Sequence, residues 1–410
     1  MSRNHRQSGT VLVLSQVYAP DPAAVGQYMA DAAARIASRG VEVRVLTAAR
    51  GYEDPSKRYP ARDQIDGVAI RRLPLSSAGK ATLTSRLFGQ VSFVLQCVAH
   101  GLFTPNLRAV FCTTSPPFGA AAGLLIARIR RVPFHYWLMD INPDQAVTSG
   151  QLRRTSLLVR ALDWLNRLIL RRATTVIALD RFMEERMRSK TVDARARLEI
   201  IPPWPLDTHL GPVDPDTKQF RQKHGLVGKR VVMYSGNHSP VHPLDTLLAA
   251  AKRLEEQEDL VFVFVGGGLE KRKIRDAIEV GARNLLSLPY QPLDEIPVSL
   301  SAADVHVVVL GDNMRGIVHP SKLYNAMLVG RPILYFGPGL SHVTELLDRH
   351  TIGWKVAHGD VDGAVKTLTE IENMPEATLR DLGGRAREVV LDEVNPEALS
   401  GRLCDIVVGG

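Results

Sequence analysis

Cysteine is scarce in this sequence, and the signals of secretion are missing. The three cysteines, Cys97, Cys112 and Cys404, lie far apart and form no CxxC pair. Neither a zinc site nor a disulfide framework is therefore expected, and a reducing compartment fits the composition. The polar stretch MSRNHRQSG leads directly into an apolar run at Val11, without the hydrophobic segment and cleavage site of a secretory leader. We expect a protein that stays in the cytoplasm.

The motifs of several common enzyme classes are also absent. The sequence has no P-loop, no HExxH or GxSxG signature and no kinase motif. The loop YAPDPAAVGQY, which contains Gly26, is not a GxGxxG dinucleotide fingerprint. D-x-D occurs as Asp214-Pro-Asp216 and Asp360-Val-Asp362, in places that suit turns or helix caps. We therefore expect no resident metal and no cofactor.

Negative charge is scarce in the first half of the chain. Residues 1–190 carry 27 Lys and Arg against 13 Asp and Glu, whereas residues 191–410 carry 24 against 30. A basic half suits a polyanion, either nucleic acid or an anionic membrane surface, although such runs are often only solvated faces. The arginines lack the interleaved aromatic residues of a nucleic-acid platform, so nucleic acid is not an expected partner. Nine arginines dominate one stretch: Arg128, Arg130, Arg131, Arg153, Arg154, Arg160, Arg167, Arg171 and Arg172.

No charged residue stands between Arg86 and Arg108. Within this stretch Ser92, Gln96 and His100 recur every four residues and would form a polar stripe along a helix, which argues against a transmembrane span. An interfacial helix with its apolar face in lipid and a buried helix of the first domain both fit the pattern. The sequence leaves these two interpretations open.

Short β-branched runs alternate with amphipathic stretches throughout the chain. Strands are expected at 11–15, 41–47 and 109–114, and again at 230–236, 260–268, 305–311 and 332–337. This rhythm predicts an α/β protein with two doubly wound parallel-sheet, Rossmann-like domains that face a central cleft. The expected divisions are an N-terminal acceptor-binding domain at 8–199, a Pro-rich linker at 200–216, a C-terminal domain at 217–385, and a helical segment at 386–410 that packs back on the first domain.

Three side chains in the first half follow strand-like runs. Ser115 lies in TTSPPFG, and Asp140 and Asp144 lie in WLMDINPDQA, so all three are expected at strand ends on the acceptor side. A carboxylate at Asp140 can orient or deprotonate a hydroxyl, but capping of the next turn is an equal alternative for Asp140 or Asp144. Gly26 begins a helix and allows a ligand to approach the backbone closely, although turn geometry alone also explains it.

In the second half, three loops at strand ends are suited to an anion. YSGNHSPVHP contributes Gly236, Asn237 and His242, and VGGGLE contributes Gly266 and Gly267. HPSKLYNAMLVGRP places Lys322 at a helix start after the expected N-cap Ser321, where the helix dipole disfavours a cation unless an anion sits there. A nucleotide diphosphate is the economical ligand for the three loops together.

These stretches, with TSPPFGAAAGLLIARIRRVPF and MDINPDQAVTSG in the same order and spacing, resemble family 4 glycosyltransferases of the GT-B fold. The resemblance is closest to the subgroup for colanic-acid, O-antigen and other surface polysaccharides. It implies a second domain that binds a nucleotide sugar, a first domain that binds the acceptor, and transfer with retention of configuration and no required metal. Asp140 then matches the subgroup's own Asp, while Met139 stands where many relatives have a His.

The sequence departs from the family at four positions. Asn237 and His242 replace an Arg and a Lys that many relatives have, and Ile317 and Asn325 replace a Glu-x7-Glu pair. Lys322, helped by His242, His319 or Arg315, is the candidate for the lost positive charge. The resemblance places further residues near the nucleotide or sugar: Tyr290, His319, Ser321, Tyr324, Asn325 and Glu345. Asp140 and Lys322 are the expected catalytic residues.

The leading hypothesis is a retaining glycosyltransferase that moves a sugar from a UDP-linked donor to a saccharide or polyprenyl-diphosphate-linked acceptor at the inner face of the plasma membrane. A nucleotide-sugar 2-epimerase would use the same architecture but needs more carboxylates than the sequence offers. The missing Arg, Lys and Glu residues also leave open a non-catalytic sugar-nucleotide-binding scaffold subunit.

Overall fold

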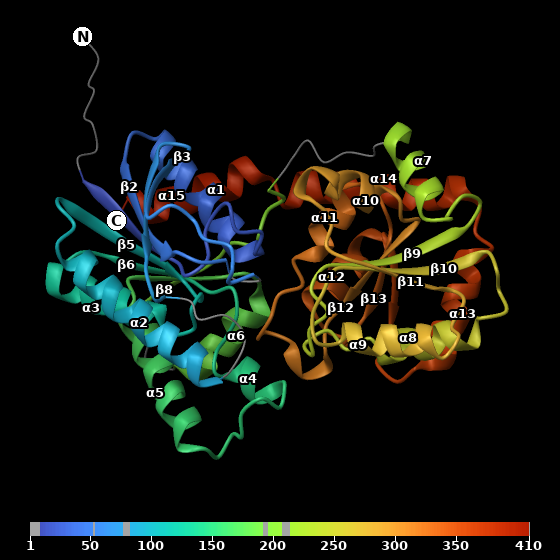
Figure 1. Ribbon diagram of the computed structural model, residues 1–410, viewed down its shortest axis with the longest axis horizontal. Helices are drawn as coiled ribbons and strands as arrows, with labels where there is room; N and C mark the ends of the chain where they lie inside the picture. The colour runs from blue at the N-terminus through green and yellow to red at the C-terminus, as the bar shows by residue number, and fades with distance from the viewer. Residues whose placement is uncertain (1–8, 52–53, 77–82, 192–195, 207–213, 410) are drawn as a thin grey trace, which may run out of the picture. The chain divides into compact units, whose positions relative to one another are not determined.

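The computed structural model describes residues 9–51, 54–76, 83–191, 196–206 and 214–409. The chain divides into two compact units (Figure 1). Unit 1 comprises residues 1–206 together with 396–410, and unit 2 comprises residues 207–395. The C-terminal segment expected at 386–410 is therefore divided, because residues 386–395 belong to unit 2 and only the last helix belongs to unit 1.

Unit 1 is built on an eight-stranded sheet in the order β3-β4-β2-β1-β5-β6-β7-β8. All neighbouring pairs are parallel except β3 and β4, which form an antiparallel hairpin at the edge. The strands are β1 (Thr10–Leu14), β2 (Glu42–Ala48), β3 (Arg62–Ile65), β4 (Val68–Leu73), β5 (Leu107–Thr113), β6 (Phe134–Trp137), β7 (Thr175–Ala178) and β8 (Arg197–Ile200).

Helices cover both faces of this sheet. The helices are α1 (Ala24–Ser38), α2 (Leu83–Leu102), α3 (Gly119–Arg130), α4 (Asp144–Thr148), α5 (Leu157–Arg172), α6 (Arg181–Lys190) and α15 (Pro396–Val408). Helices α1 and α15 pack together on one face, whereas α2, α3 and α5 form a layer on the other (Figure 1). Ion pairs from Arg35 to Glu397 and from Arg39 to Asp405 fasten α15 to α1.

Unit 2 is built on a six-stranded, wholly parallel sheet in the order β11-β10-β9-β12-β13-β14. The strands are β9 (Arg230–Ser235), β10 (Leu260–Val265), β11 (Leu285–Leu288), β12 (Val305–Val309), β13 (Ile333–Phe336) and β14 (Gly353–Val356). The helices are α7 (Asp214–Lys223), α8 (Asp245–Arg253), α9 (Lys271–Glu279), α10 (Ile296–Ser301), α11 (Lys322–Leu328), α12 (His342–His350), α13 (Val361–Glu372) and α14 (Glu376–Glu393), with short 3-10 turns η1 (Leu293–Glu295) and η2 (Asp312–Met314).

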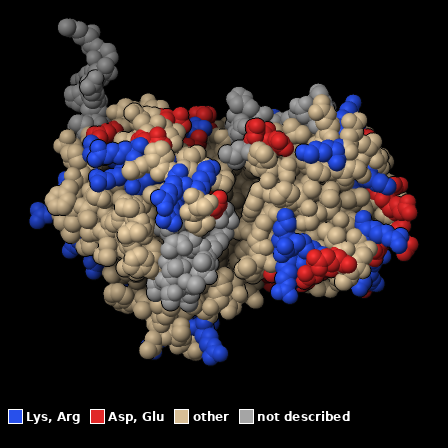
Figure 2. All heavy atoms as spheres, in the orientation of Figure 1, with Lys and Arg blue, Asp and Glu red and all other residues tan. Residues whose placement is uncertain are grey.

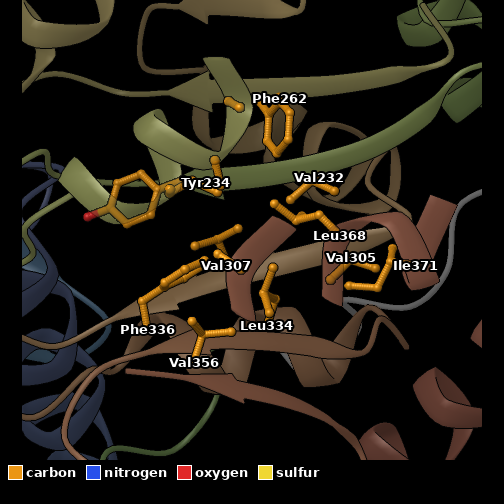
Figure 3. Close-up of a cluster of buried hydrophobic side chains, with 14 of the residues drawn as sticks. Val232, Tyr234, Phe262, Val305, Val307, Leu334, Phe336, Val356, Leu368 and Ile371 are labelled. Atoms are coloured by element: carbon orange, nitrogen blue, oxygen red, sulfur yellow. The ribbon is translucent and has the colours of Figure 1, made fainter. Parts of the chain in front are cut away.

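The strands of unit 2 are apolar on both sides because helices cover both faces of the sheet. Figure 3 shows one of the two resulting clusters, in which Phe262, Val307 and Leu334 from the sheet meet Leu368 and Ile371 of α13. The alternate residues of β9, Val231 and Met233, pack on the opposite face. Continuous apolar runs are the sequence signal of such strands, and the predicted α/β fold with two parallel-sheet domains is confirmed.

The hairpin β3–β4 was not among the predicted strands, although its turn has a recognisable signal. Asp66 and Gly67 connect the two strands and both have positive φ, +49° and +78°. An Asp-Gly pair between two short alternating runs favours such a two-residue turn because both positions tolerate a left-handed backbone.

The expected linker is partly a component of unit 1. Trp204, within the Pro-rich stretch 200–216, is fully buried, stacks on Trp137 with ring centroids 5.4 Å apart, and donates its indole N–H to Asp31 at 2.9 Å. The proline density concealed this anchor, which fixes the chain to α1 before it leaves unit 1. Residues 207–213 of the expected linker lie outside the described residues.

Helix α2, which contains the uncharged stretch, is buried along one face, as the second of the two interpretations predicts. Phe93 and Cys97 are buried, and a Cβ on Gly101 would lie 2.4 Å from Ile126 of α3, so one face belongs to the core. The polar stripe faces the loop after β4, because Gln96 donates to the carbonyl of Pro74 at 2.7 Å. No helix in the described part of the chain is long and apolar enough to cross a membrane.

Candidate functional site

Two glycines bring together the loops that follow β9 and β10. Gly236 and Gly266 come directly after these strands, each with φ of +129°. The N–H of Gly236 donates to the carbonyl of Val265 at 2.8 Å. A Cβ on Gly266 would lie 2.1 Å from the carbonyl oxygen of Gly236, so any other residue there would force the loops apart. Both predicted glycines therefore serve one place, the carboxyl end of the sheet in unit 2.

Lys322 reaches these loops from the start of α11. Its Nζ donates to the hydroxyl of Tyr234 at 2.6 Å and to the carbonyl of Asn237 at 3.1 Å, and it lies 4.5 Å from the centroid of the Tyr234 ring. Its aliphatic stem lies beside Gly236, where a Cβ would be 2.4 Å from Lys322 Cε. Gly236, Asn237 and Lys322 thus form one cluster, which we call the Lys322 cluster together with Tyr234 and Gly266.

The Lys322 ammonium has no counter-charge. Among the described residues no carboxylate forms an ion pair with it, and its contacts are with a hydroxyl and a carbonyl. Burial therefore lowers the pKa of Lys322 to about 7. A bound anion would restore the charged form, because a nearby opposite charge raises the pKa of an amine. Since α11 has only seven residues, we attribute the positive potential here to the ammonium rather than to a helix dipole.

Two histidines beside this cluster have lowered pKa values. Burial lowers the pKa of His238 to about 4 and that of His242 well below its usual value, with the charge of Lys322 adding to both shifts. His242 Nδ1 donates to the carbonyl of Val309 at 2.7 Å. The expectation that His242 helps to replace a missing positive charge stays a prediction, because burial disfavours the charged ring and a bound anion would favour it. His238 Nε2 is buried without a hydrogen-bond partner.

A hydrogen-bonded chain of three side chains joins α11 to α12. The hydroxyl of Tyr324 lies 2.8 Å from His319 Nε2 and 3.0 Å from His342 Nε2. A phenol has one proton, so Tyr324 donates to one ring and accepts from the other, which requires at least one ring to carry its proton on Nε2. The rings of His319 and Tyr324 stack with centroids 5.6 Å apart. His319 and Tyr324 were predicted site residues, and His342 joins them.

Tyr290 and Gly267 connect β11 to the Lys322 cluster. The Tyr290 hydroxyl donates to the carbonyl of Gly267 at 3.4 Å, and the backbone N–H of His238 donates to the same oxygen at 2.7 Å. The Tyr290 ring is half exposed and stands against Gly267, where a Cβ would lie 3.1 Å from it. An exposed aromatic face of this kind can stack on a planar ligand ring.

Four other residues were expected near the donor in the second half of the chain. Ser321 holds the N-cap position of α11 as predicted, but its side chain makes no capping hydrogen bond. Asn325 lies three residues after Lys322 on α11 and is partly exposed. Glu345 lies in the first turn of α12, a helix capped by Ser341. Arg315 is exposed at the end of η2.

In unit 1, Asp140 follows β6 as expected. Burial raises the pKa of its carboxyl to about 6, and among the described residues it forms neither an ion pair nor a side-chain hydrogen bond. Ser115 follows the neighbouring strand β5, and its carbonyl accepts from the N–H of Gln16 at 2.7 Å. A carboxylate with a pKa about one unit below neutrality is ionised at pH 7 and is still basic enough to accept a proton.

Asp144 and Gly26 have structural partners. The Asp144 carboxylate accepts from Arg186 at 2.8 Å and pairs with Lys190, which joins α4 to α6. It is therefore bound within the unit rather than presented to an acceptor, contrary to the prediction. A Cβ on Gly26 would lie 3.0 Å from the backbone nitrogen of Tyr18, so this glycine lets α1 approach the loop after β1. Gly26 thus has a packing role within unit 1.

Three residues of the candidate site, Tyr234, Lys271 and His342, were not predicted from the sequence. Tyr234 looked like a core residue of β9, because an apolar pattern does not distinguish a phenol whose hydroxyl emerges at the strand end. Lys271 begins α9 just as Lys322 begins α11, so the same signal was available. The Lys271 ammonium donates to the carbonyls of Gly266 at 2.5 Å and Leu288 at 2.6 Å and so ties two strand ends together. His342 had no local signal.

The D-x-D pairs are not part of the cluster. Asp360 caps α13 by accepting from the N–H of Gly363 at 2.9 Å, which confirms the predicted capping role. The side chains of Asp214 and Asp216 lie outside the described residues. Within the described ranges no group of three or more His, Cys, Asp or Glu side chains is placed to hold a metal ion.

The sequence is similar to those of several glycosyltransferases. WbjE of Pseudomonas aeruginosa, named a probable glycosyltransferase, is 30% identical over 252 residues, which are 61% of this chain and 62% of WbjE. The chain thus matches less than two thirds of that relative's length. The colanic acid biosynthesis glycosyl transferase WcaI of Escherichia coli K12 is 26% identical over 337 residues, 78% of this chain and 81% of WcaI.

A solved structure shares the fold. HepE of Anabaena, crystallised with UDP-glucose, superposes with a TM-score of 0.71 at 16% identity and covers 98% of this chain and 100% of its own. Two family models match adjacent parts of the sequence, a glycosyl transferase 4-like domain at residues 23–204 and glycosyl transferases group 1 at residues 216–389. Together they span most of the chain and both units, so the chain belongs to the glycosyltransferases of the GT-B fold, with a glycosyl transferase 4-like domain followed by a group 1 domain.

Proposed function

We propose that this protein is a retaining glycosyltransferase that takes a sugar from a UDP-sugar and attaches it to a saccharide carried on a polyprenyl diphosphate. The observation that carries the proposal is the unpaired Lys322 ammonium beside two glycine loops. A buried amine without a counter-ion costs free energy unless a ligand supplies the charge. A diphosphate supplies two such charges and many acceptor oxygens.

The glycine loops, the Tyr290 ring and the relative HepE support a UDP-sugar as the donor. Gly236 and Gly266 let the two loops and the stem of Lys322 pack closely together, and the half-exposed ring of Tyr290 adds an aromatic face suited to a base. HepE, which has the same fold, was crystallised with UDP-glucose. UDP-linked sugars are therefore the proposed donors, and Asn325, Tyr324 and Glu345 are the proposed neighbours of the sugar or ribose.

The proposed reaction breaks one bond and forms one. The bond from the anomeric carbon of the sugar to the β-phosphate oxygen breaks, and UDP leaves with the electron pair. A new bond forms from the anomeric carbon to an acceptor oxygen, whose proton passes to a base. Lys322 offsets the negative charge that grows on the diphosphate as the bond breaks. This stabilisation requires the donor diphosphate to be bound beside Lys322 beforehand. Asp140 is the proposed base, because its raised pKa suits proton acceptance near neutral pH.

The proposal includes no metal and no cofactor, because Lys322 supplies the positive charge that a divalent cation would otherwise provide. The acceptor proposal follows the relatives, WcaI being assigned to colanic acid biosynthesis. A lipid-linked acceptor would place the protein at the inner face of the plasma membrane as a peripheral protein. The basic first half suits such a location.

The proposal is tested by measuring UDP release from UDP-glucose, UDP-galactose and other UDP-sugars with a lipid-linked saccharide fraction as acceptor. We expect release with one donor, unchanged by EDTA, and an NMR spectrum of the product with the anomeric configuration of the donor. Asp140→Asn should abolish release but retain UDP binding. Binding of UDP without release would favour the scaffold hypothesis, and conversion of the donor into its 2-epimer would favour the epimerase.

A further inference from the structure

The layer of α2, α3 and α5 in unit 1 has no acidic side chain on two of its three helices. The sequence contains no Asp or Glu between Asp66 and Asp140, a span that includes both α2 and α3. The space-filling view shows no red atoms over these two helices, and their surface is mostly tan (Figure 2). Helices α2 and α3 therefore add no negative charge to this surface.

Large apolar side chains are exposed on all three helices of this layer. On α2, Phe88 is 62% exposed and Leu95 is 65% exposed. These two residues lie two turns apart on the same face of the helix. Trp164 of α5 is 65% exposed. The exposed apolar residues of the layer, with one at the end of α2, are Phe88, Val91, Leu95, Phe103, Leu125, Ile129, Leu157, Leu158 and Trp164. We call this set the docking face.

The docking face is one surface rather than three separate helices. Helix α3 contacts both α2 and α5. Arg130 of α3 donates to the carbonyls of Leu102 at 2.5 Å and Thr104 at 2.9 Å, which fixes α3 to the end of α2. Exposed apolar side chains gathered on packed neighbouring helices are typical of a surface that binds a partner or a membrane.

Arginines without ion-pair partners flank the docking face. Among the described residues none forms an ion pair with Arg128, Arg131, Arg153, Arg154, Arg160, Arg171 or Arg172. The acids of the region are already neutralised: Asp163 pairs with Arg167 at 2.7 Å and with Lys190 at 2.6 Å. The unpaired guanidinium groups are therefore available to anions outside the protein.

Helix α5 shows the combination most clearly. Trp164 lies one turn after Arg160 and two turns before Arg171, so the indole and both guanidinium groups share one face. The opposite face, with Val159, Asn166 and Ile169, is buried in unit 1. An exposed indole flanked by arginines is the arrangement that favours the boundary between lipid headgroups and acyl chains.

We propose that the docking face binds the surface of an anionic lipid bilayer, with Leu95 and Trp164 inserted below the headgroups and the flanking arginines bound to lipid phosphates. A second copy of this chain is a poorer occupant, because a symmetric contact would bring the unpaired arginines of both copies together. Nucleic acid does not explain the apolar residues. The inference rests on the proposed function in one respect: a lipid-linked acceptor is the reason for the protein to bind a membrane.

The test is cosedimentation of the full chain with vesicles of phosphatidylcholine, with or without phosphatidylglycerol, in the absence of nucleotide. Two double variants probe the face: Leu95→Ser with Trp164→Ser, and Arg160→Gln with Arg171→Gln. The matched controls are Val280→Ser, an exposed apolar residue of unit 2, and Arg283→Gln. UDP affinity is measured for every variant.

We expect wild type to bind the anionic vesicles and each double variant to bind them about tenfold or more weakly, while the controls match wild type. UDP affinity should be equal in all, so a loss of vesicle binding is separable from a failure of the donor site. The proposal would be overturned if wild type bound neutral vesicles equally well, or if either double variant bound anionic vesicles as wild type does. It would also be overturned if the protein bound no vesicles and instead formed a dimer that Leu95→Ser with Trp164→Ser dissociates.

Discussion

Near the carboxyl end of the sheet in each unit lies a charge that has no ion-pair partner among the described residues, Asp140 in unit 1 and Lys322 in unit 2, and the two charges are opposite. Burial raises the pKa of Asp140 in unit 1 to about 6 and lowers that of Lys322 in unit 2 to about 7. Their neighbours differ: Asp144 pairs with Arg186 and Lys190, and Lys271 donates to two carbonyls. The Asp144 charge is paired within unit 1, whereas among the described residues Asp140 and Lys322 have no ion-pair partner, and the proposal assigns both to the substrates.

The largest expected effect comes from Asp140→Asn. If Asp140 accepts the acceptor proton, the amide removes the base at nearly constant shape, and turnover should fall by about 100-fold or more. UDP affinity should be unchanged, because the donor cluster lies in unit 2. The measurement is the rate of UDP release together with a UDP titration. A variant with normal turnover would remove Asp140 from the mechanism.

Lys322→Met should also lower turnover, by about 100-fold, because the diphosphate loses the cation that offsets its growing charge. The matched control is Lys273→Met, which removes the same charge from an ion-paired lysine of the same unit; Lys273 binds Asp245 at 2.9 Å. We expect the control to retain turnover. Equal losses in both variants would show that net charge, not the Lys322 cluster, sets the rate.

Asp144→Asn tests the difference between the paired Asp144 and the proposed base Asp140 in unit 1. The substitution leaves Lys190 and Arg186 with less compensation in a mostly buried cluster, so the free energy of unfolding should fall by about 1–3 kcal/mol. Turnover by the folded protein should match wild type. The measurements are urea unfolding and UDP release at a temperature where the variant stays folded. A large turnover loss at full stability would return Asp144 to the acceptor side.

The pH dependence of UDP affinity is the smallest predicted effect. Lys322 is charged below pH 7 and neutral above it, so affinity should fall as pH rises, by about tenfold between pH 7 and 8.5, and binding should take up a proton. Titrations in buffers of different ionisation enthalpy measure that proton. Lys322→Met should show neither the slope nor the proton, and a slope that survives in the variant would assign the titration to another group.

The same shift affects stability in the opposite direction. Between pH 7 and about 10 the unfolded chain holds a proton on Lys322 that the folded chain has released, so the free energy of unfolding should rise with pH relative to Lys322→Met. For Asp140 the folded pKa is the higher one, so its contribution decreases as pH rises from about 4 to 6.

Local signals predicted the sheets and part of the site. Continuous apolar runs such as LVFVFV identify buried parallel strands, and glycines directly after them identify the loops at Gly236 and Gly266. Lys322 was found because a cation at a helix start is out of place. These features depend on a few neighbouring residues, which is why the sequence alone predicts them.

The remainder depends on long-range packing. The state of His242 follows from its burial against Val309, and that of Asp144 from cations about 40 residues further along the chain. The exposed face of α2 is defined only when α3 covers Phe93 and Cys97. Burial of Trp204 depends on Trp137, which is distant in sequence. No local pattern carries this information.

The most direct test of the central claim is a calorimetric titration of UDP into the wild-type protein, Lys322→Met and Lys273→Met, each with and without EDTA. We predict metal-independent binding to wild type and to Lys273→Met, and binding weaker by about 1–3 kcal/mol to Lys322→Met, as expected for a lost charged hydrogen bond. Equal affinity of wild type and Lys322→Met for UDP, or binding that EDTA abolishes, would contradict the account.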